Sequence, residues 1–152
     1  MPAFSNALTA LAALSVSGVA RNAAPDALPL TITRAHLPIL LVIPGDTGER
    51  SLFNSRSEGF TAAAFPGGAR TLAVQVTHLL LVASRDDGLG ARSHLPRVIA
   101  LLDAYFAALS LNPTLSGTLC EPARVTVEPG SVVYSGAAYH GATLRHLWVL
   151  GY

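Results

Sequence analysis

The strongest strand pattern in the chain is residues 70–83, Arg-Thr-Leu-Ala-Val-Gln-Val-Thr-His-Leu-Leu-Leu-Val-Ala. In its first half, Leu72, Val74 and Val76 alternate with small or polar residues, which is the period of a strand with one buried face. From Leu79 onward both faces become apolar. At about 3.3 Å per residue the strand would span roughly 45 Å, longer than most strands in a domain of this size. The stretch therefore predicts a long strand that bends or has one end covered by another segment.

Two shorter strands are predicted before this one. Residues 37–43 form a continuous apolar run that ends at Pro44-Gly45, which is typical of a central strand covered on both faces. Residues 60–65 have the pattern of an edge strand. The polar stretch 45–59 between them is long enough to be either a contact arm or a mobile loop or irregular hairpin.

Two helices are predicted. In the longer, central one Ser93 is expected as the N-cap, with His94 and Pro96 in the opening turn, and the helix ends before Asn112. A shorter amphipathic helix is expected near the N-terminus, with Gly18 as its stop signal. The central helix has one broad apolar face, formed by Leu95, Val98, Ile99, Leu102, Tyr105, Phe106 and Leu109.

The last third of the chain has the pattern of an antiparallel meander. Residues 124–128 alternate with Val125 and Val127 inward, and Gly130 is expected to open a turn. Two further strands, 131–134 and 139–150, are expected to join around Ser135-Gly136. In the second of them one face carries Leu144, His146 and Trp148, and the other carries Arg145, Leu147 and Val149.

These elements predict a single domain over residues 1–152, since 152 residues are too few for two independently stable hydrophobic cores. The expected fold class is α+β: a mixed, mostly antiparallel sheet packed by an N-terminal helix and a longer central helix. No apolar run approaches the ~20 residues that cross a bilayer, so no membrane segment is expected.

The composition indicates a partner. Hydrophobic residues make up 51% of the chain and charged residues only 12%, against about 25% charged in an average soluble domain. Some apolar surface is therefore expected to meet another protein, the alternative being an alanine-rich monomer without apolar patches. The ten basic residues are all arginines and are scattered, so sequence-specific nucleic-acid binding is not expected.

No motif in the sequence indicates catalysis or a cofactor. The serine-nucleophile motif G-x-S-x-G is absent, and the Gly45–Arg50 stretch lacks the lysine of a phosphate-binding loop. Cys120 is the only cysteine, so neither an intrachain disulfide nor a thiolate zinc cage can form. The histidines show neither metal-ligand spacing nor an adjacent carboxylate, so no metal site is expected; they are His36, His78, His94, His140 and His146.

The order of elements along the chain carries a resemblance: a helix, a buried strand, a polar loop, a long strand, a second helix, an amphipathic strand and a hairpin. The local sequence of the second half strengthens it. A helix with Leu101-Leu102-Asp103-Ala104-Tyr105 at its centre is followed by Leu115-Ser116-Gly117-Thr118, by Val125-Thr126-Val127, and by residues 133–141, Val-Tyr-Ser-Gly-Ala-Ala-Tyr-His-Gly. This pattern resembles the tail-terminator and tail-completion (neck) proteins of tailed bacteriophages. The likeness is a diffuse pattern over most of the chain, within residues 1–152, rather than one diagnostic motif.

The resemblance implies a structural virion protein and not an enzyme. Such a protein forms a ring, commonly a hexamer, that caps the tail tube at its head-proximal end, stops tube polymerisation and joins the tail to the head. The implied partners are copies of itself, the tail-tube protein and a head–tail connector or stopper protein, with no cofactor. The implied location is the virion tail, reached from the host cytoplasm during assembly, with DNA passing through the lumen.

Alternatives stay open at this point. Within the same region of the virion they are a head-completion, stopper or tail-tube protein; outside it they are a small binding module or an enzyme with an unrecognised site. The candidate subunit or tube contacts lie in the 45–59 arm and at the apolar end of residues 70–83. The alternative interpretation of the arm is a flexible loop, and that of the strand end is an ordinary core strand. The candidate contacts are Arg50, Leu52, Phe53, Arg56, Glu58, His78, Leu79 and Leu81.

Overall fold

A computed structural model describes residues 3–44, 60–64 and 70–151, of which residues 60–64 and Arg70 are described by their backbone alone. The helices are α1 (Ala3–Ala12) and α2 (Ala91–Leu111), with short 3-10 turns η1 (Pro25–Ala27), η2 (Arg34–His36) and η3 (Arg85–Asp87). The strands are β1 (Arg21–Ala23), β2 (Ile39–Ile43), β3 (Phe60–Ala64), β4 (Arg70–Ser84), β5 (Arg124–Tyr134) and β6 (Ala137–Gly151).

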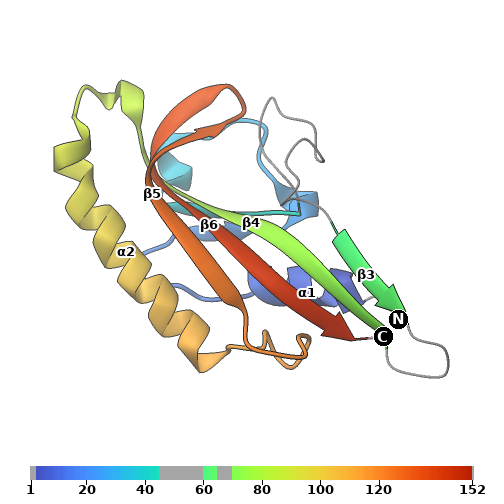
Figure 1. Ribbon diagram of the computed structural model, residues 1–152. Helices are drawn as coiled ribbons and strands as arrows, with labels where there is room; N and C mark the ends of the chain where they lie inside the picture. The colour runs from blue at the N-terminus through green and yellow to red at the C-terminus, as the bar shows by residue number, and fades with distance from the viewer. Residues whose placement is uncertain (1–2, 45–59, 65–69, 152) are drawn as a thin grey trace.

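The six strands form one sheet in the order β1-β2-β4-β6-β5, and β3 pairs with β4 beside this path. Only β1 and β2 run parallel, while the other pairs are antiparallel. The long strands β4, β6 and β5 cross the molecule side by side (Figure 1). The predicted α+β class with a mixed, mostly antiparallel sheet and two helices is confirmed.

The main core lies between one face of the sheet and both helices. Leu11 of α1 and Val98, Leu101 and Tyr105 of α2 pack there against apolar side chains of β2, β4 and β6. Trp148 of β6 is fully buried in this core. Burial of such large side chains is the main stabilising contribution to a domain of this size.

A second, smaller core covers the other face at one end of the sheet. Ile39, Leu41 and Ile43 of β2 pack there with Leu79 and Leu81 of β4, under the segment that carries η1 and η2. Because Leu40 and Val42 face the main core, all five residues of β2 are buried. The prediction of a strand covered on both faces is therefore confirmed.

The length of β4 is explained by its neighbours. One edge of β4 pairs with β3 over Arg70–Val74 and with β2 over Thr77–Leu81, so two short strands share the edge of one long strand. The other edge pairs with β6 along nearly its whole length, with a register shift between Leu81 and Ala83. The predicted long strand and the predicted edge strand before it are confirmed.

Four local predictions are wrong. Helix α1 ends at Ala12 and not at Gly18, where its stop was expected. The central helix begins at Ala91 with Gly90 as its N-cap, because the Ser93 N–H already donates to the Gly90 carbonyl at 3.0 Å. Gly130 opens no turn, since β5 continues through Pro129 and Gly130 to Tyr134. Residues 22–29, whose prolines predict a loop, begin inside strand β1, whose three residues are too few to show a period.

Candidate functional site

The predicted contact residues fall into two groups. Arg50, Leu52, Phe53, Arg56 and Glu58, like the whole 45–59 arm, lie outside the described residues. The other three belong to β4 and are inside the subunit.

The prediction that the apolar end of β4 forms subunit contacts is corrected by its burial. His78, Leu79 and Leu81 are 0%, 2% and 0% exposed, respectively. The α2 side of the sheet covers His78, and the segment with η1 and η2 covers the two leucines. The apolar run on both faces of this strand reflects two cores within one chain, so these side chains have no surface to offer a partner.

The exposed apolar surface lies instead on α2. Leu95, Ile99 and Phe106 are 46%, 51% and 42% exposed. Their spacing of four and seven residues places them in one row along the helix, next to the buried row that includes Leu102. The predicted apolar face of this helix is therefore only partly used by the core.

Helix α2 is long and apolar enough to cross a membrane by length and composition, contrary to the expectation that no such segment exists. Five of its residues, from Val98 to Leu109, are buried in the core, which is the behaviour of a core helix. Of its 21 residues, however, only these five are buried. The helix thus has more apolar surface than its own domain covers.

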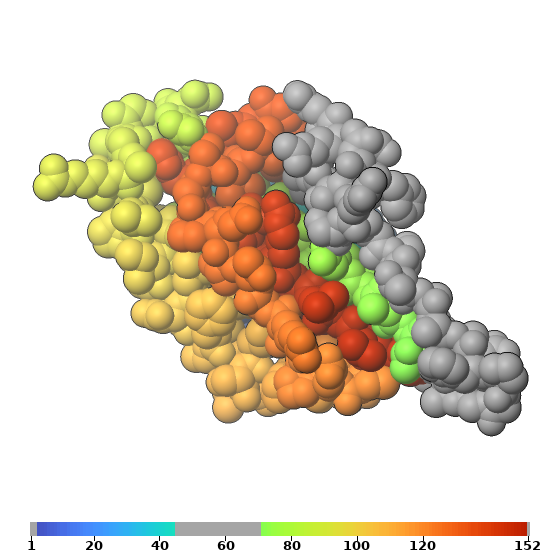
Figure 2. Space-filling model, in the orientation of Figure 1, coloured from blue at the N-terminus to red at the C-terminus, as the bar shows by residue number. Residues whose placement is uncertain are grey.

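Strand β5 forms an open edge beside this helix. Within the described part of the chain β5 pairs only with β6, so its outer backbone groups have no strand partner. A surface hollow lined by Leu95 of α2, Gly130 of β5 and His140 of β6 shows that the row on α2 begins next to this edge. Figure 2 shows α2 and β5 adjoining on the same visible face of the molecule. Helix row and strand edge together form the α2–β5 surface.

A second feature is a chain of polar side chains inside the main core. Trp148 Nε1 lies 3.3 Å from His146 Nδ1, His146 Nε2 lies 2.6 Å from Tyr105 Oη, and Tyr105 Oη lies 2.8 Å from His78 Nδ1. Because the indole N–H can only donate, His146 Nδ1 accepts and neutral His146 carries its proton on Nε2. It then donates to Tyr105, whose hydroxyl donates to His78.

The chain continues to the end of α1. The remaining proton of neutral His78 is on Nε2, which donates to Asn22 Oδ1 at 2.9 Å. The Asn22 amide donates to the carbonyls of Leu11 and Leu14, at 2.8 and 3.1 Å, where α1 ends. Every hydrogen bond in the network thus points the same way, and the network ties β6, α2, β4 and β1 to α1. Its role is structural, because its histidines and Tyr105 are sealed from solvent.

Burial sets the protonation of this network. It lowers the pKa of His78 well below its usual value, helped by the neighbouring His146, and lowers the pKa of His146 to about 4. It also raises the pKa of the Tyr105 hydroxyl. All three groups are therefore neutral at pH 7, as the hydrogen-bond directions require.

A third feature brings together residues that are distant in sequence. His94 Nε2, in the first turn of α2, lies 2.7 Å from Asp87 Oδ2 at the end of η3. The ring of His140 on β6 stacks on that of His94, with centroids 4.8 Å apart. The Leu89 N–H, which donates to Asp87 Oδ1 at 2.8 Å, lowers the pKa of the Asp87 carboxyl. The expectation that no histidine has a carboxylate neighbour is wrong for His94.

No spacing rule could have identified this group. Asp87 and His94 are seven residues apart across a turn, and His140 comes from the other side of the sequence. Their proximity depends on the sheet, which brings the start of β6 next to the end of β4. His140 and His146 are six residues apart on β6, a spacing that places both on one strand face, but they belong to different clusters.

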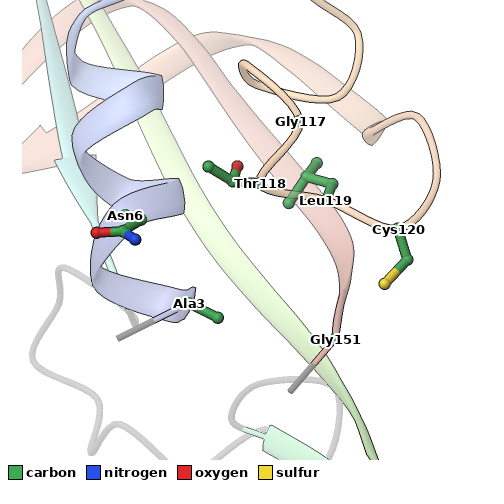
Figure 3. A pocket seen from close by; sticks show the side chains of 7 residues that line it. All are labelled: Ala3, Asn6, Gly117, Thr118, Leu119, Cys120 and Gly151. Carbon is green, nitrogen blue, oxygen red and sulfur yellow. The ribbon is translucent and has the colours of Figure 1, made fainter. Parts of the chain in front are cut away.

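An open hollow of about 380 Å³ lies between α1, the 117–120 loop and the end of β6. Figure 3 shows Asn6, Thr118 and Cys120 as its polar side chains, with Ala3 and Leu119 beside them. Cys120 is exposed rather than buried. Its described lining contains neither a histidine nor a charged group that could activate the thiol.

Comparisons of the chain with protein-family models, with characterised proteins and with solved structures found no match.

Proposed function

We propose that this chain is a structural subunit that assembles into a ring at the head-proximal end of a bacteriophage tail, where it stops tube growth and joins the tail to the head. The observation that carries the proposal is the α2–β5 surface, an exposed row of large apolar side chains beside an open strand edge. In a chain with so few charged residues, such a surface is best explained by contact with another protein.

Ring formation needs two different patches on each subunit, because a head-to-tail interface repeats around an axis. The α2–β5 surface supplies one patch. A second candidate is Leu30, which is 91% exposed and belongs to the segment over the opposite face of the sheet from α2. Patches on opposite sides of the sheet suit head-to-tail contacts better than a two-fold dimer.

The test is the molar mass of the purified chain by light scattering, over a range of concentrations at moderate salt, with electron microscopy of the same samples. We expect a constant mass of several subunits and ring-shaped particles. Added tail-tube protein should give tubes that are capped at one end. A chain that stays monomeric both alone and with tube protein would contradict the proposal, and a monomer that binds only a connector ring would favour a stopper role instead.

A further inference from the structure

We propose that Asp87, His94 and His140 bind a divalent transition-metal ion of the zinc type, held by two imidazole nitrogens and one carboxylate oxygen. This site adjoins the α2–β5 surface at His140, but it does not depend on the proposed assembly role. The ligand atoms of the three residues all lie within 4.8 Å of one another. Two ligands of a tetrahedral zinc ion, each at about 2.0–2.2 Å from it, lie roughly 3.4 Å apart. Small side-chain rotations that separate the 2.7 Å His94–Asp87 pair and shorten the wider distances therefore suffice to form the site.

The nitrogen atoms of this cluster lack the partners that buried imidazoles normally have. His140 is 7% exposed, and its Nε2 is buried with no hydrogen-bond partner. His94 Nε2 is also buried and, although it is 2.7 Å from Asp87 Oδ2, the two atoms are not aligned as a hydrogen bond. A buried polar atom without a partner is unfavourable. A cation between these atoms would satisfy both nitrogens and the carboxylate at once.

The backbone around the cluster fixes the direction of the ligands. Gly88 adopts a left-handed conformation directly after η3, which turns the chain toward α2. The Leu89 N–H occupies Asp87 Oδ1, so Oδ2 is left to face His94. The register shift between β4 and β6 occurs where His140 pairs with Ala83. Such irregularities are frequent next to binding sites because they re-aim a side chain.

The donor set selects the class of ion. Magnesium and calcium prefer oxygen ligands throughout, whereas imidazole nitrogens suit zinc, cobalt, nickel and iron. Three protein ligands leave at least one coordination position for solvent or a small anion. Asp87 and His94 line a surface hollow of about 330 Å³ together with Arg34 and Arg97, which provides the entry path.

The test uses the chelator-treated full chain with Co²⁺ and Zn²⁺ as probes. We expect one Co²⁺ per chain with the visible absorption of a low-coordinate site, displacement by Zn²⁺, and a Tm that rises with Zn²⁺ but not with Mg²⁺. His140→Ala and Asp87→Asn should each weaken Co²⁺ binding by at least about tenfold. The matched control His36→Ala, which removes the histidine that belongs to neither histidine cluster, should bind as the unaltered chain does.

A measurement on the unaltered chain keeps the test independent of variant folding. In imidazole ¹⁵N spectra, Zn²⁺ should shift the signals of His94 and His140 and leave that of His36 in place. Absence of Co²⁺ absorption up to millimolar concentration, equal binding by His140→Ala, or a shift of the His36 signal instead would each overturn the proposal.

Discussion

Tyr105 Oη lies 2.6 Å from His146 Nε2, and this short hydrogen bond joins α2 to β6 at the centre of the main core. The same oxygen lies 2.8 Å from His78 Nδ1 on β4. One hydroxyl therefore both accepts and donates between two neutral histidines. Removing it leaves two buried polar atoms without a partner, which is more destabilising than the loss of an ordinary hydrogen bond.

Tyr105→Phe is accordingly expected to lower the free energy of unfolding by about 2–4 kcal/mol, as judged from roughly 1–3 kcal/mol for each unpaired buried group. Urea denaturation followed by circular dichroism measures this. Tyr134→Phe is the matched control: its hydroxyl donates to the Pro29 carbonyl at 2.7 Å in a partly exposed place, so its loss should be about 1 kcal/mol. Equal effects of the two variants would show that the network adds nothing beyond a single hydrogen bond.

The same network predicts a loss of stability in mild acid. His78 and His146 both have a folded-state pKa below the unfolded value of 6.5, and that of His146 is about 4. Between these pH values the unfolded chain binds more protons than the folded chain, so stability falls as the pH is lowered. Each histidine contributes a slope of about 1.4 kcal/mol per pH unit. Together they should remove on the order of 4 kcal/mol between pH 7.5 and pH 5.

The groups that face these rings are Asn22, Tyr105, Trp148 and the rings themselves, none of them charged at neutral pH. The measurement is urea denaturation in steps from pH 7.5 to pH 5. His78→Gln should reduce the slope by about 1.4 kcal/mol per pH unit relative to the unaltered chain. A slope in His78→Gln equal to that of the unaltered chain would contradict the assignment of the acid sensitivity to the core.

The α2–β5 surface gives a prediction for assembly. Ile99→Glu places a charge in the middle of the exposed apolar row and should lower the molar mass to that of the monomer. Because Ile99 is half-exposed in the subunit, the Tm of the variant should change little. Ala107→Glu, on an exposed part of the same helix outside the row, should leave the molar mass unchanged. Light scattering of the two variants decides this, and an Ile99→Glu chain of unaltered mass would remove α2 from the interface.

The sequence predicted the elements whose pattern is long and regular. The alternation in β6 correctly separated Leu144, His146 and Trp148 from the residues on the outer face, and the Ser135-Gly136 hairpin is confirmed, with both residues at positive φ. The prediction of a turn at Gly130 was wrong because an edge strand tolerates Pro129, which has no N–H to donate. A local turn signal was thus overridden by pairing with β6.

The candidate site was much less accessible to sequence reasoning. Burial of His78 among apolar residues could be expected from its neighbours, but its partner Asn22 lies 56 residues away on a strand of three residues. The apolar end of β4 was predicted to be a contact surface. A strand segment that is buried on both faces within one subunit has the same apolar composition as a segment that is buried at an interface. In the structure β2 and β6 pair with its two edges, and its two faces are covered by the helices and by the segment with η1 and η2.

The last prediction concerns Gly141, which follows His140 where β4 and β6 shift register. A Cβ at Gly141 would lie 1.8 Å from the Leu80 carbonyl oxygen and 2.9 Å from its carbon. Backbone atoms cannot yield as a side-chain end can, so Gly141→Ala must separate the two strands at the centre of the sheet. We expect a loss of about 3 kcal/mol or more in the free energy of unfolding.

Gly90→Ala is the matched control, since a Cβ there meets nothing within 4 Å and the residue has an ordinary negative φ. Its effect should stay within about 1 kcal/mol, the range of an altered helix N-cap. Thermal and urea unfolding of the two variants compare the same chemical change in two places. If Gly141→Ala were as stable as Gly90→Ala, the close approach of β4 to β6 would be refuted, and with it the backbone geometry that holds His140 against His94.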